Sequence, residues 1–127
     1  MPDAEVRRVT ASAVQAARDP DLSLPDAAGT ARGVLVDLPG FRSGDALASA
    51  LLTAAAPTRM AVYDGRAHAG LAGLGIVLPS RRRYRTYLAH LADFLRDAPE
   101  EAADWRPRDV DVALYMLGAP GTNSPTL

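Results

Sequence analysis

Apolar residues recur at helical spacing in six stretches of this chain, and proline or glycine separates most of these stretches. We predict helices over about residues 3–18, 27–36, 45–56, 64–74, 80–96 and 109–117. No stretch shows the alternation of apolar and polar side chains that is typical of a half-buried strand. The sequence therefore predicts an all-α fold, a small helical domain of about six helices.

The size and composition fit one small domain. The chain has 127 residues, of which 48% are hydrophobic and 6% aromatic, so its core must consist mainly of leucine, alanine and valine. We predict a single helical domain over residues 1–118. Residues 119–127 hold turn formers and little apolar content, which predicts a disordered C-terminal tail.

The charge balance restricts the kind of nucleic-acid contact that the chain can make. All 14 basic residues are arginine, 15 residues are acidic, and the formal charge is −1. A strong duplex binder is usually broadly basic, so any DNA contact must be a local patch. The chain has no cysteine, which excludes disulfides, thiolate zinc sites and cysteine-held iron–sulfur clusters. Two histidines are few nitrogen ligands for a metal site, so we expect no metal and no cofactor.

The sequence gives no sign of membrane insertion or secretion. It contains no apolar run of 18 residues, and its first residues are polar. We therefore expect no membrane partner and a cytoplasmic protein.

A Leu-Pro-Gly turn precedes an alanine-rich helix at residues 38–56. We predict a helical hairpin at about residues 34–56, whose loop leaves backbone N–H groups free to meet an anion such as a nucleic-acid phosphate. The candidate DNA-binding residues of this loop are Leu38, Gly40, Arg42, Ser43 and Gly44.

Asp64 follows the predicted hairpin and opens the next predicted helix. As an N-cap it would have a structural role only. Tyr63, Arg66 and His68 lie close to it in the sequence. Asp64 and His68 are four residues apart and would share one helix face, where they could form an acid/base pair. The alternative is that Arg66 and His68 are partly exposed surface residues.

These segments resemble the helix-hairpin-helix DNA glycosylases, the superfamily of endonuclease III and the adenine-mismatch glycosylases. The resemblance covers about residues 34–76 and rests on Leu38-Pro39-Gly40-Phe41, on the alanine-rich stretch 48–54 and on Val62-Tyr63-Asp64. Two features differ from the family pattern. Arg42 and Ser43 lengthen the hairpin before Gly44, and 127 residues leave little room for a second helical subdomain.

The resemblance implies a DNA glycosylase-like function, the hydrolysis of an N-glycosidic bond in base-excision repair. Asp64 would then be the catalytic carboxylate that stabilises positive charge on the sugar or directs water at it, with Tyr63 and His68 beside it. The chain has no lysine to form a Schiff base, so such an enzyme would be monofunctional and without lyase activity. The alternative is a non-catalytic helical module, derived from that scaffold, for binding DNA or protein.

A second group of cations lies at the start of the helix predicted for residues 80–96. Arg81, Arg82, Arg83 and Arg85 could bind phosphates together with Arg66, and Tyr84 or Tyr87 could offer a stacking surface. A solvated helix face is the alternative. Ser80 is the predicted N-cap of this helix.

The last helical stretch follows the only tryptophan, Trp105. We expect this ring to pack against the core, with base stacking as the alternative. We also expect that a homodimer, if one forms, uses an apolar patch on the helix of residues 80–96 or 109–117.

Overall fold

The computed structural model describes residues 1–120, and over these residues the chain is helical with no β-strand. The predicted all-α fold is confirmed. The elements, in order, are α1 (Asp3–Arg18), α2 (Leu24–Leu35), α3 (Ala46–Ala55), α4 (Gly65–Gly73), α5 (Arg83–Arg96), the short 3-10 helix η1 (Glu100–Ala102) and α6 (Pro107–Leu117). Of the predicted tail, only Ala119 and Pro120 belong to the described residues.

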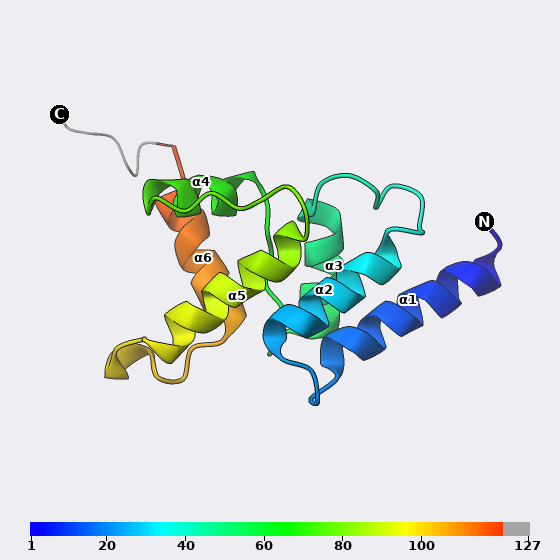
Figure 1. Cartoon of the computed structure of the whole chain (residues 1–127), viewed down its shortest axis with the longest axis horizontal. Coiled ribbons are helices and arrows are strands. Elements are labelled where there is room, and N and C mark those ends of the chain that lie inside the picture. The colour runs from blue at the N-terminus through cyan, green and yellow to red at the C-terminus, as the bar shows by residue number, and fades with distance from the viewer. Residues whose placement is uncertain (121–127) are drawn as a thin grey trace.

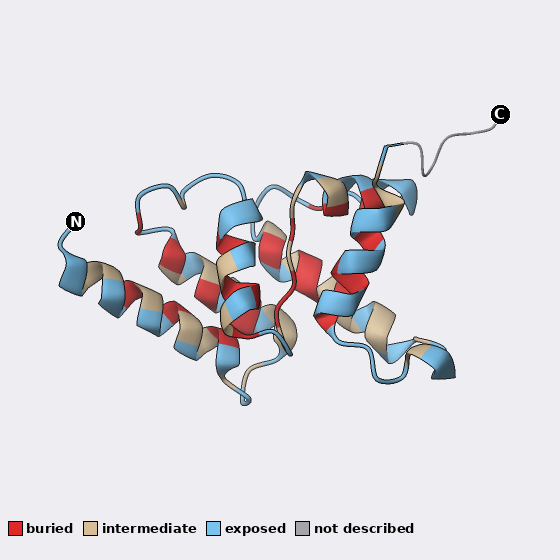
Figure 2. Ribbon diagram, turned by 180° about the vertical axis from the view of Figure 1, so that it is seen from behind, coloured by how far each residue is buried: buried red, intermediate tan, exposed pale blue. Residues whose placement is uncertain are grey.

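The helices pack as two groups that meet at α5 (Figure 1). In the first group α1 lies along α2, which also contacts α3 and α5. In the second group α4 packs on α6, and α6 contacts α5. Figure 2 shows that the buried residues lie on the inner faces of the helices and along the link between α3 and α4.

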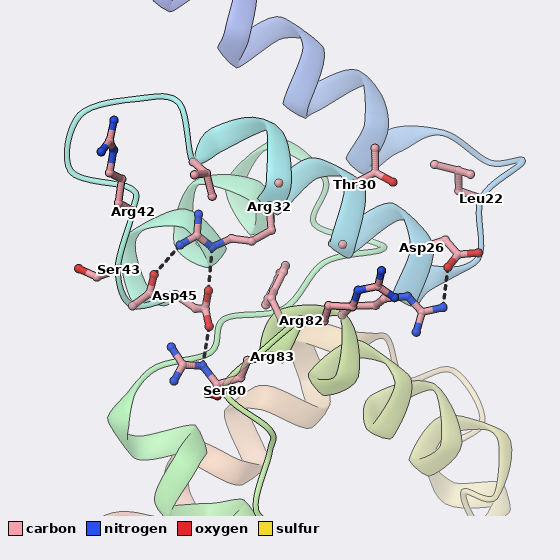
Figure 3. A pocket seen from close by; sticks show the side chains of 16 residues that line it. Leu22, Asp26, Thr30, Arg32, Arg42, Ser43, Asp45, Ser80, Arg82 and Arg83 are labelled. Atoms are coloured by element: carbon pink, nitrogen blue, oxygen red, sulfur yellow. Dashed lines mark hydrogen bonds and ion pairs between the residues drawn. The ribbon is translucent and has the colours of Figure 1, made fainter.

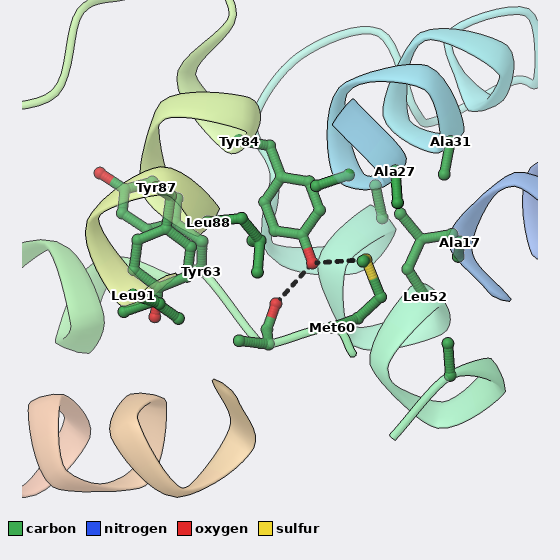
Figure 4. Packing of buried hydrophobic residues seen from close by; sticks show 14 of the residues in the cluster. Ala17, Ala27, Ala31, Leu52, Met60, Tyr63, Tyr84, Tyr87, Leu88 and Leu91 are labelled. Atoms are coloured by element: carbon green, nitrogen blue, oxygen red, sulfur yellow. Dashed lines mark hydrogen bonds between the residues drawn. The ribbon is translucent and has the colours of Figure 1, made fainter. Parts of the chain in front are cut away.

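The core uses small side chains on one side and large ones on the other. Apart from Leu35, the fully buried residues of α1 and α2 are alanines, which allow close packing of the two helices: Ala13, Ala17, Ala27, Ala28 and Ala31. Around α5 the buried side chains are larger, as Figure 4 shows, and include Tyr84, Tyr87, Leu88 and Leu91. α5 is therefore the central helix of the core.

The backbones of α4 and α6 almost touch. A Cβ atom on Gly70 would lie 2.3 Å from the carbonyl oxygen of Leu114, and one on Gly118 would lie 2.2 Å from that of Arg66. Neither distance is sterically allowed for a real Cβ atom. Glycine at both positions is therefore required for this close approach.

Two helix starts follow from side-chain caps. The Asp64 carboxylate accepts a hydrogen bond from the N–H of Ala67 at 2.9 Å, which confirms Asp64 as the N-cap of α4. Ser23 Oγ accepts from the N–H of Asp26 at 3.2 Å, and α2 therefore begins at Leu24, three residues before the predicted start.

The predicted start of α5 is wrong. Arg82, not Ser80, holds the N-cap position, and its φ of 53° is left-handed. An α-helix cannot continue through a left-handed residue, so the helix begins only at Arg83.

The predicted packing of Trp105 against the core is also wrong, because its side chain is 43% exposed. Trp105 lies in the turn after η1, where its backbone N–H donates to the carbonyl of Ala102 at 3.1 Å. α6 begins two residues later, at Pro107, and it is Pro107 that is buried.

Candidate functional site

An open cleft of about 820 Å³ lies between α2, the loop before α3 and the start of α5. Figure 3 shows that its walls come from segments far apart in the sequence. Five arginines and two aspartates give the lining a formal charge of +3, whereas the whole chain carries −1. The lining residues are Leu22, Asp26, Gly29, Thr30, Arg32, Gly33, Val36, Arg42, Ser43, Gly44, Asp45, Ser80, Arg82, Arg83, Tyr84 and Arg85.

Asp45 connects the three walls of this cleft. Its side chain is only 8% exposed, and its two oxygens accept from Arg32 Nε and Arg83 Nε, each at 2.7 Å. Arg32 Nη2 also donates to the carbonyl of Gly44 at 2.8 Å. The hydrogen bond to Asp45 raises the pKa of Arg83 further above its already high value. One carboxylate thus holds two guanidinium groups in fixed positions.

A second ion pair crosses the other end of the cleft. Arg85 Nη2 donates to Asp26 Oδ1 at 2.8 Å, and both side chains are partly exposed. This hydrogen bond is the main cause of the lowered pKa of Asp26, followed by a hydrogen bond with Ser23. A Cβ atom on Gly29 would lie 3.2 Å from the Arg85 side chain, so a glycine here leaves room for the arginine.

The loop between α2 and α3 contains the Leu-Pro-Gly segment on which the hairpin prediction rests. The N–H of Phe41 donates to the carbonyl of Leu38 at 3.2 Å, and Leu38 is buried. Gly40 and Gly44 have φ angles of 87° and 70°, a left-handed conformation that favours glycine. This geometry turns the chain so that Arg42, Ser43 and Gly44 line the cleft.

Tyr63 links this cleft to α4. The Arg83 guanidinium carbon lies 5.6 Å from the centre of the Tyr63 ring. Tyr63 Oη lies 2.9 Å from His68 Nδ1, and burial is the main cause of the raised pKa of Tyr63. Within the described residues the imidazole of His68 therefore pairs with Tyr63, whereas the Asp64 carboxylate caps α4.

Asp64 lines a second, smaller cleft of about 410 Å³ together with residues of α6. In this cleft Asp111 is buried and accepts from the N–H of Val62 and from Arg108 Nη1, both at 2.6 Å. Burial is the main cause of the raised pKa of Asp111, and the charge of Asp64 acts in the same direction. The two clefts share no lining residue.

The structure brings together most of the cations that the sequence suggested, but not all of the candidate residues. The loop residues Arg42, Ser43 and Gly44 share one cleft with Arg82, Arg83 and Arg85. The residues outside that lining are Leu38, Gly40, Tyr63, Asp64, Arg66, His68 and Arg81.

Arg66 packs against another helix. Its guanidinium carbon lies 3.9 Å from the centre of the Tyr115 ring, and its Nη1 donates to Tyr115 Oη at 3.1 Å.

The prediction that Tyr84 or Tyr87 offers a stacking surface for a base is wrong. Tyr84 is 2% exposed and Tyr87 is fully buried, so neither ring can receive a base. Their positions on α5 place them on its inner face, between the two helix groups.

Three charged residues of the cleft were missed by the sequence analysis: Asp26, Arg32 and Asp45. The spacing of Asp26, Gly29 and Gly33 places them on one face of α2, and this face carries small and polar residues. That pattern could have indicated a helix face turned toward a cleft.

Among residues 1–120, no three His, Asp or Glu side chains gather closely enough to hold a metal ion. None of the described helices combines the length and the apolar character needed to cross a bilayer. The exposed apolar side chains of α6 are Val112, Tyr115 and Met116, so the predicted homodimer seam has a candidate surface there.

Comparison of the chain with protein-family models, with curated proteins and with solved structures finds no match. The relationship to the helix-hairpin-helix glycosylases stays a prediction from residues 34–76.

Proposed function

We propose that this chain is a DNA-binding module that holds the phosphate backbone in its arginine-lined cleft. The observation that carries this proposal is the convergence of Arg32 and Arg42 with three arginines of residues 82–85. These segments are about forty residues apart in the sequence, and they form a positive surface on a chain of net negative charge.

The chemistry of the cleft suits phosphate. A guanidinium group offers several N–H donors in a planar fork that matches two phosphate oxygens. Asp45 fixes Arg83, whose side chain is 34% exposed, before a ligand arrives, which lowers the entropic cost of binding. Arg42 and Arg82 are exposed and add charge at the mouth of the cleft.

The described lining of the cleft offers no exposed aromatic ring on which a base could stack. Tyr84 is the one aromatic residue among its described lining residues, and it is buried. Contacts to phosphates position a protein on DNA without reading its sequence. We therefore expect binding that depends little on the base sequence.

Fluorescence anisotropy with a short labelled duplex tests this proposal. The double variant Arg82→Gln/Arg85→Gln should bind about tenfold or more weakly than the native chain. The matched control Arg7→Gln/Arg96→Gln removes the same charge from exposed helix surfaces outside the cleft. Its affinity should change less than threefold.

Two results would contradict the proposal. Equal losses in the two double variants would assign the binding to net charge alone. Displacement of the duplex by polyglutamate as effectively as by unlabelled DNA would instead indicate an acidic protein partner.

We propose monofunctional hydrolysis of an N-glycosidic bond in DNA as a second function, with Asp64 as the catalytic residue. Asp64 lines the smaller cleft opposite the apolar side chains of Val112 and Met116. The cap of α4 uses its Oδ1, so Oδ2 can still face a ligand. A carboxylate in this position could stabilise positive charge on a sugar as the base departs.

Base release from a panel of damaged and mismatched duplexes tests this second function. Asp64→Asn is the informative variant, because asparagine also caps helices well and the fold should be kept. Release by the native chain that is lost in Asp64→Asn supports hydrolysis. Binding by both proteins without release leaves the DNA-binding module as the function.

A further inference from the structure

The two aspartates of the arginine-lined cleft differ in their surroundings. Asp45 is 8% exposed and accepts from two arginines that belong to different elements. Asp26 is 51% exposed and accepts from one arginine, Arg85. Both carry the same charge, but one is part of the wall and the other faces solvent.

Asp26 holds the guanidinium that a phosphate would need. The Arg85 side chain passes Gly29 of α2, and its Nη2 donates a hydrogen bond to Asp26 Oδ1 at 2.8 Å. A carboxylate and a phosphate oxygen accept the same hydrogen bonds from arginine. Because an exposed ion pair contributes little free energy, a phosphate can displace this carboxylate.

We propose that Asp26 is a built-in competitor of phosphate at Arg85, whereas Asp45 is a positioning residue that prepares Arg83 for phosphate. This inference rests on the proposed DNA-binding function. It has a consequence that net charge alone cannot produce. Neutralising Asp26 strengthens DNA binding, and neutralising Asp45 weakens it.

The strengthening at Asp26 follows from the release of one guanidinium. In Asp26→Asn the side chain still fills the same space, but its charge no longer holds Arg85. The gain is limited to what an exposed ion pair contributes, which corresponds to about two- to fivefold tighter binding.

The weakening at Asp45 follows from the loss of one oriented guanidinium, that of Arg83, whose side chain is 34% exposed. Arg32 is only 12% exposed and donates to Asp45 and to the carbonyl of Gly44, so it belongs to the wall that holds Asp45 in place. Without the carboxylate, Arg32 and Arg83 repel each other and lose their fixed geometry. We expect Asp45→Asn to bind about fivefold or more weakly.

The experiment measures duplex affinity by anisotropy for the native chain, Asp26→Asn and Asp45→Asn. Asp37→Asn is the matched charge control, because Asp37 is exposed in the loop between α2 and α3 and does not line the cleft. In the presence of Arg85→Gln, the effect of Asp26→Asn should vanish. This double-mutant cycle assigns the competition to that one pair.

The outcomes separate this inference from the proposed function. If the native chain does not bind the duplex, the DNA-binding function itself is wrong. If the native chain binds but Asp26→Asn and Asp37→Asn behave alike, the competition is wrong and the function stands.

If Asp45→Asn fails to fold, Asp45→Glu serves as the second variant, because it keeps the charge and shifts the carboxylate by one methylene. Weaker binding by this variant supports positioning, and unchanged binding contradicts it.

Discussion

The hydroxyl group of Tyr84 donates a hydrogen bond to the backbone carbonyl of Ala61 at 2.6 Å, inside the core. Tyr87 Oη donates in the same way to the carbonyl of Val62 at 2.8 Å. Both carbonyls belong to the non-helical link between α3 and α4. The two tyrosines of α5 therefore fix the segment that carries Tyr63 and Asp64.

Replacing Tyr84 by phenylalanine should lower the free energy of unfolding by about 1–3 kcal/mol. The variant keeps the ring but removes the donor from a buried carbonyl, which then lacks that partner. Urea unfolding followed by circular dichroism measures the difference. The control is Tyr115→Phe, which removes only an exposed hydrogen bond from Arg66 Nη1, and it should change the free energy of unfolding by less than about 0.5 kcal/mol.

The stability of the chain should fall as the pH rises above about 10. Burial is the main cause of the raised pKa of both Tyr84 and Tyr87 in the folded chain. A raised pKa in the folded state favours folding below the unfolded pKa of about 10, and this contribution is lost above it.

With the two phenols of Tyr84 and Tyr87, the free energy of unfolding should fall by up to about 2.7 kcal/mol per pH unit above pH 10. Urea unfolding at a series of pH values tests it, and a flat profile up to pH values well above 10 would contradict the buried state of these hydroxyls.

Alanine at position 70 should destabilise the contact between α4 and α6. Its Cβ would lie 2.3 Å from the carbonyl oxygen of Leu114, so one of the two helices has to move. We expect a loss of about 1–3 kcal/mol, the usual cost of overpacking.

Gly33→Ala is the matched control for this change. Gly33 is also a helical glycine, but a Cβ there meets nothing within 4 Å. Its substitution should stabilise the chain by about 0.5–1 kcal/mol. Thermal melts of both variants should therefore shift in opposite directions.

The affinity for duplex DNA should fall steeply with salt. If three to four arginines of the cleft neutralise phosphates, the logarithm of the association constant plotted against the logarithm of the salt concentration has a slope of about −3 to −4. Arg82→Gln should make this slope shallower by about 0.9, while Arg7→Gln should leave it unchanged. A slope near zero in the native chain would exclude phosphate contacts as the source of binding.

The sequence predicted the helices well where their limits depend on local signals. The predicted range of the first helix, residues 3–18, matches α1, because Asp19-Pro20 ends it. Asp64 was likewise predicted as an N-cap, since capping depends on the next three residues. The start of α5 could not be predicted, because the left-handed conformation of Arg82 has no glycine or asparagine to indicate it.

The cleft could be predicted only in pieces. Arg42 and the arginines of residues 81–85 were recognised as two separate cationic groups. The structure brings α2 and α5 together at Asp45. This carboxylate accepts from Arg32, 13 residues away in the sequence, and from Arg83, 38 residues away. Such a contact is set by how α2 packs on α5, and hydrophobic periodicity within one helix carries no information about it.

The cations of the cleft are all guanidinium groups, because the chain contains no lysine. Guanidinium keeps its charge at every pH at which a protein normally stays folded. It also offers no amine that acetylation could neutralise. Release of a bound anion therefore has to come from competing ions or from the carboxylates of the cleft itself, and not from deprotonation or acylation of its cations.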